Sequence, residues 1–219
     1  MRGIIIDGVA GSGKSSILNY IHSEIHKKYP SSTKFFISEH YTERMLEHLR
    51  DKKELNGFHI KSHVSRIIEN LRMYQQMLDK SKFSQNPQGA DIFVTIERFL
   101  LTHFASMDIE SEYSVDEAKS HFNTLNKLGI KQIALIIPES RLRESILSTL
   151  NYRNEKWKEH LYSKGTEKKI VESYLNWQKR FMNYVAKFRD HIETKVIEIQ
   201  NNNYQNYGEL IIDSYFRKR

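Results

Sequence analysis

The stretch GVAGSGKSS, residues 8–16, decides how the rest of the chain is interpreted. It contains the spacing G-x-x-x-x-G-K-S, whose fixed positions are Gly8, Gly13, Lys14 and Ser15. Because glycine has no side chain, the backbone N–H groups of such a stretch are able to turn inward around an anion. The pattern predicts a phosphate-binding loop, provided that a strand precedes it and a helix follows it.

Both neighbours of this stretch have the required character. Residues 2–7, RGIIID, form a short apolar run with β-branched side chains, which is typical of a buried strand. Residues 14–29 place isoleucine and leucine on one face at helical spacing. The loop is therefore expected between the end of a strand and the positive end of a helix dipole. A glycine-rich turn with a chance lysine is the alternative, and this context disfavours it.

The expected roles of the loop residues follow from the chemistry of a nucleoside triphosphate. Lys14 would reach the terminal phosphates, and the Ser15 hydroxyl would ligate Mg²⁺. The groups that we expect around the phosphates are those of Gly8, Gly11, Ser12, Gly13, Lys14, Ser15 and Ser16. We therefore expect ATP and Mg²⁺ as cofactors.

Strands and helices alternate along the chain. Apolar runs that predict strands lie at 2–7, 34–38, 91–96, 131–138 and 195–200. Helical periods lie at 14–29, 41–55, 59–80, 98–107, 115–128, 139–150, from about 167, and at the C-terminal end. This alternation predicts an α/β fold of the P-loop NTPase class over residues 1–219, with a five-stranded parallel sheet and helices on both faces. A basic lid segment is expected at roughly 139–166.

Two helices carry more specific expectations. The segment SVDE fits a capping box formed by Ser114 and Glu117, and Gly129 is placed to end the same helix. In the helix over 59–80, Leu71, Met73, Tyr74, Met77 and Leu78 predict a largely buried element.

Composition limits the other classes of function. The chain has 219 residues, a net charge of +7 and no cysteine, and no apolar run approaches the roughly 20 residues that span a membrane. We therefore expect a cytoplasmic protein with no membrane partner, no disulfides and no cysteine-based metal site. The basic balance suits an anionic ligand such as a nucleotide, and a solvated basic surface is the equal alternative.

Acidic and basic residues follow two of the predicted strands. Ligands of parallel α/β sheets bind beyond the carboxyl ends of the strands, where Glu39, Glu97 and Arg98 are expected. Glu39 would face the phosphoryl acceptor and either take a hydroxyl proton or bind a sugar, unless it only stabilises a helix dipole. Glu97 would contact Mg²⁺ and Arg98 would clamp a phosphate, unless the two form a surface ion pair.

Three further arginines belong to the predicted site. Arg72 lies on an otherwise apolar helix and would reach the acceptor or extend to water. The expected lid holds Arg141 as well as Arg143 and Arg153, and the last two would neutralise transferred charge, unless that segment is an exposed helical hairpin. We expect Glu39, Arg72 and Arg98 to converge opposite the loop. Two arginines beside one carboxylate favour a monophosphate acceptor over a neutral nucleoside.

Several segments resemble thymidylate kinases and the related deoxynucleoside kinases. IIIDGVAGSGKSS is similar to their opening strand and phosphate loop, SEHYT to the segment that carries a glutamate, and IER to their acid–arginine pair. ENLRMY resembles the helix whose arginine reaches the acceptor in thymidylate kinases, and IPESRLRESI followed by YRNE resembles the strand-four exit and lid. The resemblance implies phosphoryl transfer from Mg-ATP. Ala10 and Ile68 replace the acid and the aromatic residue that thymidylate kinases use, so the acceptor base stays open.

The sequence thus predicts an ATP-dependent phosphotransferase acting on a nucleoside monophosphate or a nucleoside. Two alternatives stay open: a P-loop sensor or switch that binds ATP without small-molecule kinase activity, and a polynucleotide end kinase. The expected partner is a small-molecule phosphoryl acceptor. Nucleic-acid binding and homodimerisation are left open, the first of them being less favoured.

Overall fold

All strands of the described residues join one parallel sheet. The computed structural model describes residues 1–81, 92–149, 155–163 and 165–216. The strands are β1 (Arg2–Gly8), β2 (Thr33–Ile37), β3 (Ile92–Glu97), β4 (Ile130–Ile136) and β5 (Thr194–Glu198). Their order is β2-β3-β1-β4-β5, and each neighbouring pair is parallel. The predicted five-stranded parallel sheet is confirmed, and the strand ends differ from the predicted ones by two residues at most.

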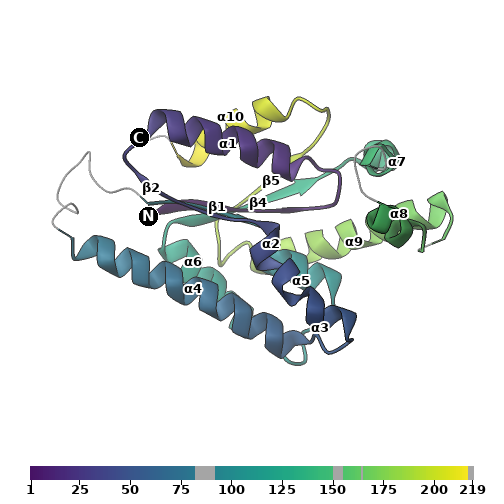
Figure 1. Ribbon diagram of the computed structural model, residues 1–219, viewed down its shortest axis with the longest axis horizontal. Helices are drawn as coiled ribbons and strands as arrows, with labels where there is room; N and C mark the ends of the chain where they lie inside the picture. Colours follow the sequence, from purple (N-terminus) through teal and green to yellow (C-terminus); the bar gives the residue numbers. More distant parts are fainter. Residues whose placement is uncertain (82–91, 150–154, 164, 217–219) are drawn as a thin grey trace.

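Helices cover both faces of this sheet (Figure 1). Those in the described ranges are α1 (Lys14–Lys28), α2 (Glu39–Thr42), α3 (Glu47–Asp51), α4 (Gly57–Asp79), α5 (Leu100–Ser106), α6 (Val115–Lys127), α7 (Glu139–Ser148), α8 (Glu155–Tyr162), α9 (Glu167–Phe188) and α10 (Tyr204–Tyr215). A 3₁₀ turn, Arg44–Leu46, separates α2 from α3. Helices α1 and α10 pack on one face, and α4, α5, α6 and α9 on the other.

The apolar run of β1 explains its central position. Ile4, Ile5 and Ile6 are fully buried, and their side chains alternate between the two faces. Ile5 joins the core beneath α4, α5 and α6, whereas Ile4 and Ile6 join the core beneath α1 and α10. Burial of each such side chain contributes about 2 kcal/mol. A strand with two apolar faces is therefore most stable in the middle of the sheet.

The predicted limits of α6 are confirmed. Ser114 accepts a hydrogen bond from the backbone N–H of Glu117, and the Glu117 carboxylate accepts one from the N–H of Ser114 at 3.1 Å. Gly129 follows the helix with φ of 78°, and a Cβ there would lie 2.6 Å from the carbonyl oxygen of Met1. Only glycine fits this turn.

The segment predicted as one helix over 41–55 is divided into three short pieces. The division falls at Glu43, whose φ and ψ of −124° and −49° leave the helical region. The Thr42 hydroxyl donates to the carbonyl oxygen of Glu97 at 2.7 Å, which ties this segment to the end of β3. The prediction was wrong because a tertiary contact overrides the local helical period.

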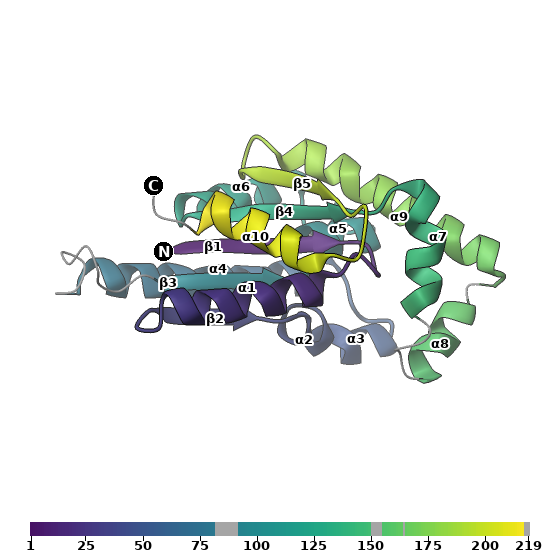
Figure 2. The same ribbon diagram turned by 90° about the horizontal axis from the view of Figure 1, so that it is seen from above.

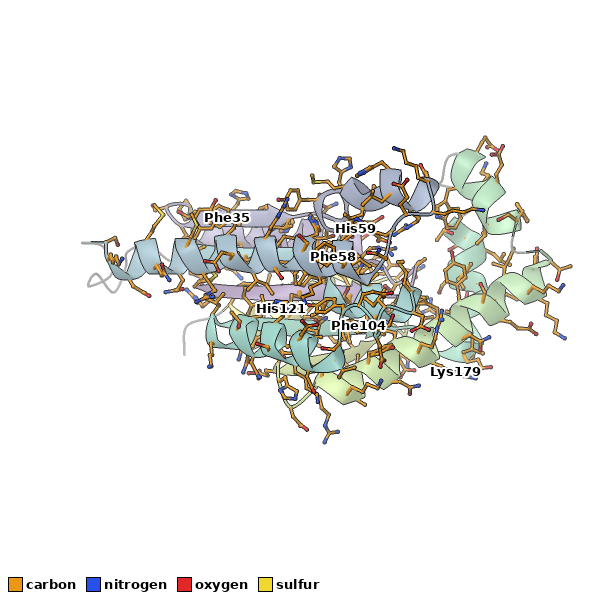
Figure 3. The ribbon with its side chains drawn as sticks, turned by 90° about the horizontal axis from the view of Figure 1, so that it is seen from below. Phe35, Phe58, His59, Phe104, His121 and Lys179 are labelled. Atoms are coloured by element: carbon orange, nitrogen blue, oxygen red, sulfur yellow. The ribbon has the colours of Figure 1, made fainter. Side chains whose placement is uncertain are left out.

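Helix α4 is less buried than its sequence predicts. Leu71 is buried, but Met73, Tyr74 and Met77 have exposed fractions of 49%, 37% and 65%. The ring of Tyr74 stacks on that of Phe35 at 4.3 Å, beside a groove of about 330 Å³ between α4 and the edge strand β2. Figure 3 shows Phe35 away from the beginning of α4, where Phe58 and His59 lie. The helix packs by one face only, so the prediction of burial was wrong for these three residues.

The helices in the described ranges were also compared with the dimensions of a bilayer. None of them combines the length and the apolar character that a membrane crossing requires.

Candidate functional site

The glycine loop, residues 8–13, connects β1 to α1 at the carboxyl edge of the sheet. Gly11 and Gly13 have φ of 82° and 75°, which residues with side chains rarely adopt. Gly13 is the N-cap of α1, and no side chain caps this helix. The first N–H groups of α1 are therefore available to an anion at the positive end of the helix dipole.

Two other helices approach the glycine loop closely. A Cβ on Gly13 would lie 2.0 Å from a ring carbon of Tyr204, the first residue of α10. A Cβ on Gly11 would lie 2.8 Å from the carbonyl oxygen of Ser145 in α7. Packing as well as backbone conformation therefore requires glycine at both positions.

The ammonium group of Lys14 points back into the glycine loop. It donates to the carbonyl oxygens of Gly8 and Val9 at 2.8 and 3.0 Å, and the side chain is buried. Burial and, to a smaller extent, the nearby charge of Arg98 lower the pKa of Lys14, Glu97 and Glu39 oppose them, and the resulting pKa is about 7. A lysine in this state would gain a proton when an anion binds beside it.

We expect nucleotide binding to take up a proton. Because the pKa of Lys14 is about 7 in the free protein, most of the amine is neutral at about pH 8, and a bound polyphosphate would raise this pKa. ATP binding at about pH 8 should then be accompanied by proton uptake at Lys14, and this contribution of Lys14 should vanish at about pH 5, where the amine is already protonated. Titration calorimetry in buffers of different ionisation enthalpy measures this uptake. Equal heats in all buffers at about pH 8 would contradict it.

Asp7 fixes the base of the glycine loop. Its carboxylate accepts from the N–H of Phe99 at 2.8 Å, from the hydroxyl of Thr102, and from the amide of Gln132 at 3.1 Å. These partners lie after β3 and within β4, so one side chain ties the end of β1 to the segment after β3 and to β4. Burial raises the pKa of Asp7, and the hydrogen bonds and Lys14 oppose that rise.

Ser15 and Glu97 meet directly beside the loop. The Ser15 hydroxyl donates to the Glu97 carboxylate at 3.1 Å. Hydroxyl and carboxylate oxygens are donors that suit Mg²⁺, which usually takes one or two carboxylates and completes its shell with phosphates and water. No group of three or more His, Cys, Asp or Glu side chains able to hold a metal occurs in the described residues. The Ser15–Glu97 pair offers two oxygen donors of the kind that Mg²⁺ accepts.

Glu39 and Arg98 form an ion pair opposite the glycine loop. Arg98 Nε lies 2.8 Å from Glu39 Oε2, and both side chains are largely buried. Burial raises the pKa of Glu39, but the charges of Arg98, Lys14 and Arg44 outweigh it and hold the pKa below its usual value. Glu39 is therefore ionised at neutral pH. Figure 2 shows that the strands point toward the end of the sheet where α2 and α7 lie.

Arg72 does not join this group. It is exposed and pairs with Glu69 at 3.3 Å on the surface of α4. Gln75, less than one helical turn further on, accepts a hydrogen bond from the amino group of Met1 at 2.7 Å. This part of α4 thus lies at the start of β1, about 20 Å from its carboxyl end. The predicted convergence of Arg72 with Glu39 and Arg98 is wrong, because α4 runs antiparallel to the strands.

The expected lid arginines are also placed differently. Arg143 is exposed and pairs with Glu167 of α9 at 2.7 Å, on the side of α7 away from the glycine loop. Arg141 instead donates to the carbonyl oxygen of Ile199 at 3.1 Å and to the side chain of Asn202 at 3.4 Å, beside α10. Arg153 lies outside the described residues. In this arrangement Arg141, rather than Arg143, lies on the side of the loop.

Sequence reasoning missed two contributors to the site: Glu43 contacts Arg98, and Tyr204 covers Gly13. Arg141, which contacts the chain after β5, belongs to the expected basic segment, but the sequence does not show which of its arginines faces the loop. Glu43 had no sequence signal, because its position depends on the interruption of the helix at that residue.

No protein-family model matches the chain, and no curated protein matches it significantly. The grounds for a function are therefore the fold, the geometry of the carboxyl edge and the short segments quoted above.

Proposed function

We propose that the protein is an ATP-dependent kinase that transfers the γ-phosphate of Mg-ATP to a hydroxyl group of an uncharged acceptor of the nucleoside class. One observation carries the proposal: the Glu39–Arg98 ion pair lies across from a glycine loop whose lysine is buried at its centre. A carboxylate and an arginine at this position suit a hydroxyl acceptor and a transferring phosphoryl group. The resemblance of GVAGSGKSS and IER to the deoxynucleoside kinases supports the same class.

The donor side of the site would bind the polyphosphate of ATP. The N–H groups at the start of α1 would hold its oxygens, and Lys14 would turn from the carbonyl oxygens of Gly8 and Val9 to the phosphates. The Ser15 hydroxyl and Glu97 would hold Mg²⁺, which neutralises phosphate charge when bound.

Glu39, Arg98 and Lys14 would have different roles during phosphoryl transfer. Glu39 would accept the proton of the acceptor hydroxyl while that oxygen forms a bond to the γ-phosphorus. The bond from the γ-phosphorus to the bridging oxygen breaks, and its electron pair leaves with ADP. Arg98 and Lys14 would stabilise the charge on the transferring group.

The pairing of the arginines favours an uncharged acceptor. Arg44 and Arg98 both contact Glu39, at 3.3 and 2.8 Å, and Arg50 contacts Glu43 at 3.4 Å. Arg72, which would have favoured a monophosphate, lies at the other end of the sheet. A phosphorylated acceptor would have to displace a carboxylate from its guanidinium, whereas a hydroxyl needs only the ionised Glu39. We therefore prefer a nucleoside to a monophosphate.

Replacing Glu39 with glutamine should abolish transfer while ATP binding is retained. Glutamine keeps the shape of the side chain but cannot accept the proton, so we expect kcat to fall by about 10²- to 10⁴-fold. Steady-state kinetics and calorimetry with ATP measure the two effects. Glu69→Gln, which breaks the exposed pair with Arg72, is the matched control and should leave kcat unchanged. Full activity of a folded Glu39→Gln protein would refute the role of this base.

The acceptor class is tested by ATP consumption with a panel of nucleosides and their monophosphates. We expect turnover with a nucleoside and no effect of Arg72→Ala. Turnover of monophosphates alone, lost in Arg72→Ala, would overturn the uncharged acceptor. Tight ATP binding without turnover of any small acceptor would favour the ATP-binding switch. Phosphorylation of polynucleotide ends, weakening steeply with salt, would favour the polynucleotide kinase.

A further inference from the structure

An alternating chain of charges crosses the acceptor side of the site. It runs Arg44–Glu39–Arg98–Glu43–Arg50, with N–O distances of 3.3, 2.8, 3.5 and 3.4 Å along its length. The outer arginines are exposed, whereas Arg98 at the centre has an exposed side-chain fraction of 18%. Arg98 is thus held between two carboxylates four residues apart, and only one of them is needed as the base.

The backbone of Arg98 is also in an unfavourable conformation. Its φ is 51°, and Arg98 is one of two non-glycine residues with positive φ in the described residues. Such a conformation persists only where the surroundings hold it. The N–H of Arg98 donates to the carbonyl oxygen of Ile6 at 3.1 Å, and the guanidinium is held by Glu39 and Glu43. A strained arginine with two counter-ions keeps its position when one of them is neutralised.

Glu43 has the features of the second, permanent counter-ion. Its Oε2 atom is buried and accepts no hydrogen bond within the described residues, although Arg98 lies 3.5 Å away. Glu43 raises the pKa of Arg98 more than Glu39 does, after burial has lowered it. The interruption of the helix at Glu43, and the bond from Thr42 to the end of β3, direct this side chain toward Arg98.

We infer that Glu43 is a positioning residue that holds Arg98 in place while Glu39 leaves it to take the proton of the acceptor. The inference rests on the proposed kinase function and adds a residue that the transfer step itself does not use. When Glu39 becomes protonated, its attraction for Arg98 disappears, and Glu43 remains to fix the guanidinium beside the transferring phosphoryl group.

The electrostatic consequence of this arrangement has a definite sign. Arg98, Lys14 and Arg44 face Glu39 and lower its pKa, against the effect of burial. Without the negative charge of Glu43, Arg98 would act on Glu39 alone, so the pKa of Glu39 would fall further and the base would be weaker. Arg50 and His103 also face Glu43, and His103 stays neutral because burial lowers its pKa to about 4.

The test compares Glu43→Gln with Glu47→Gln, an exposed acid one turn further along the chain. Carboxyl NMR titration should show a lower pKa of Glu39 in Glu43→Gln than in wild type, because one negative charge near Glu39 is removed. Kinetics with the nucleoside found in the panel should show kcat about tenfold lower, an acid limb displaced to lower pH, and an unchanged KM for ATP. Glu47→Gln should match wild type in every measurement. Glu43→Asp keeps the negative charge, so the pKa of Glu39 in this variant should lie close to its wild-type value.

Different results would overturn the kinase function and the role of Glu43. Wild-type protein that turns over no acceptor would overturn the proposed function. If wild type is active, a Glu43→Gln protein with unchanged kcat, pH profile and Glu39 pKa would overturn the role of Glu43 alone. A lower melting temperature with unchanged kinetics would also overturn it, because Glu43 would then be a purely structural residue.

Discussion

Lys14→Ala should reduce turnover by about 10³-fold and weaken ATP binding, because it removes the positive charge at the centre of the glycine loop. The ammonium group is held by the carbonyl oxygens of Gly8 and Val9 in the free protein. It would stabilise the phosphates in the ground state and the charge that develops during transfer. Kinetics and calorimetry with ATP measure both losses, and the proton uptake at about pH 8 should disappear with them.

The same substitution should not unfold the protein. The pKa of Lys14 is about 7 when folded and 10.5 in an unfolded chain, so the unfolded chain binds more protons between these values. Wild-type stability therefore rises with pH over this window, and Lys14→Ala should lose that rise and be at least as stable at neutral pH. Lys28→Ala, at the exposed end of α1, is the matched control. Unchanged ATP affinity and activity in folded Lys14→Ala would refute the phosphate-loop assignment.

Gly13→Ala should lower the melting temperature by about 10 °C and prevent nucleotide binding. Two costs add. The backbone strain of an alanine with φ near 75° lowers the free energy of unfolding by about 1–3 kcal/mol. The clash of a Cβ only 2.0 Å from the Tyr204 ring lowers it by about 1–3 kcal/mol more. Thermal unfolding followed by circular dichroism, with and without ATP, measures the change and the loss of ligand stabilisation.

A second substitution separates these two costs. In a Tyr204→Ala background, Gly13→Ala should reduce the stability by about half as much as in wild type, because only the backbone strain remains. Gly165→Ala is the control for that term, because Gly165 has φ of 107° but is exposed, with only the flexible side chain of Lys169 nearby. Equal effects of Gly13→Ala in both backgrounds would show that Tyr204 gives way and does not constrain the loop.

The elements of the sheet were predictable because local and tertiary preferences agree there. The apolar run before Asp7 makes a strand with two buried faces, and the glycine spacing fits the turn into α1. The positions of Glu39, Glu97 and Arg98 followed directly, since each residue comes at the end of a strand. Carboxyl ends of parallel strands meet at one edge regardless of the details of packing.

The errors concern side chains whose direction depends on how a helix lies. Helical period identifies the face of α4, but not which end of that helix reaches the carboxyl edge, so Arg72 was misplaced. Arg141 and Arg143 differ by two residues, about 200° around α7, and only the position of α7 between α9 and the chain after β5 decides which one faces the loop. Met73 and Met77 were predicted to be buried because their side chains are apolar. The sequence does not show that no other element among the described residues covers this face of α4.

The buried carboxylate of Asp7 has a consequence for the thermodynamics of ligand capture. It ties the base of the glycine loop to the chain after β3 and to β4 before any ligand is present. The conformational entropy of this region is therefore lost during folding, and a nucleotide does not have to order it. Asp7→Asn should accordingly weaken ATP binding mainly through a less favourable binding entropy, because the carboxylate holds Phe99, Thr102 and Gln132 in place.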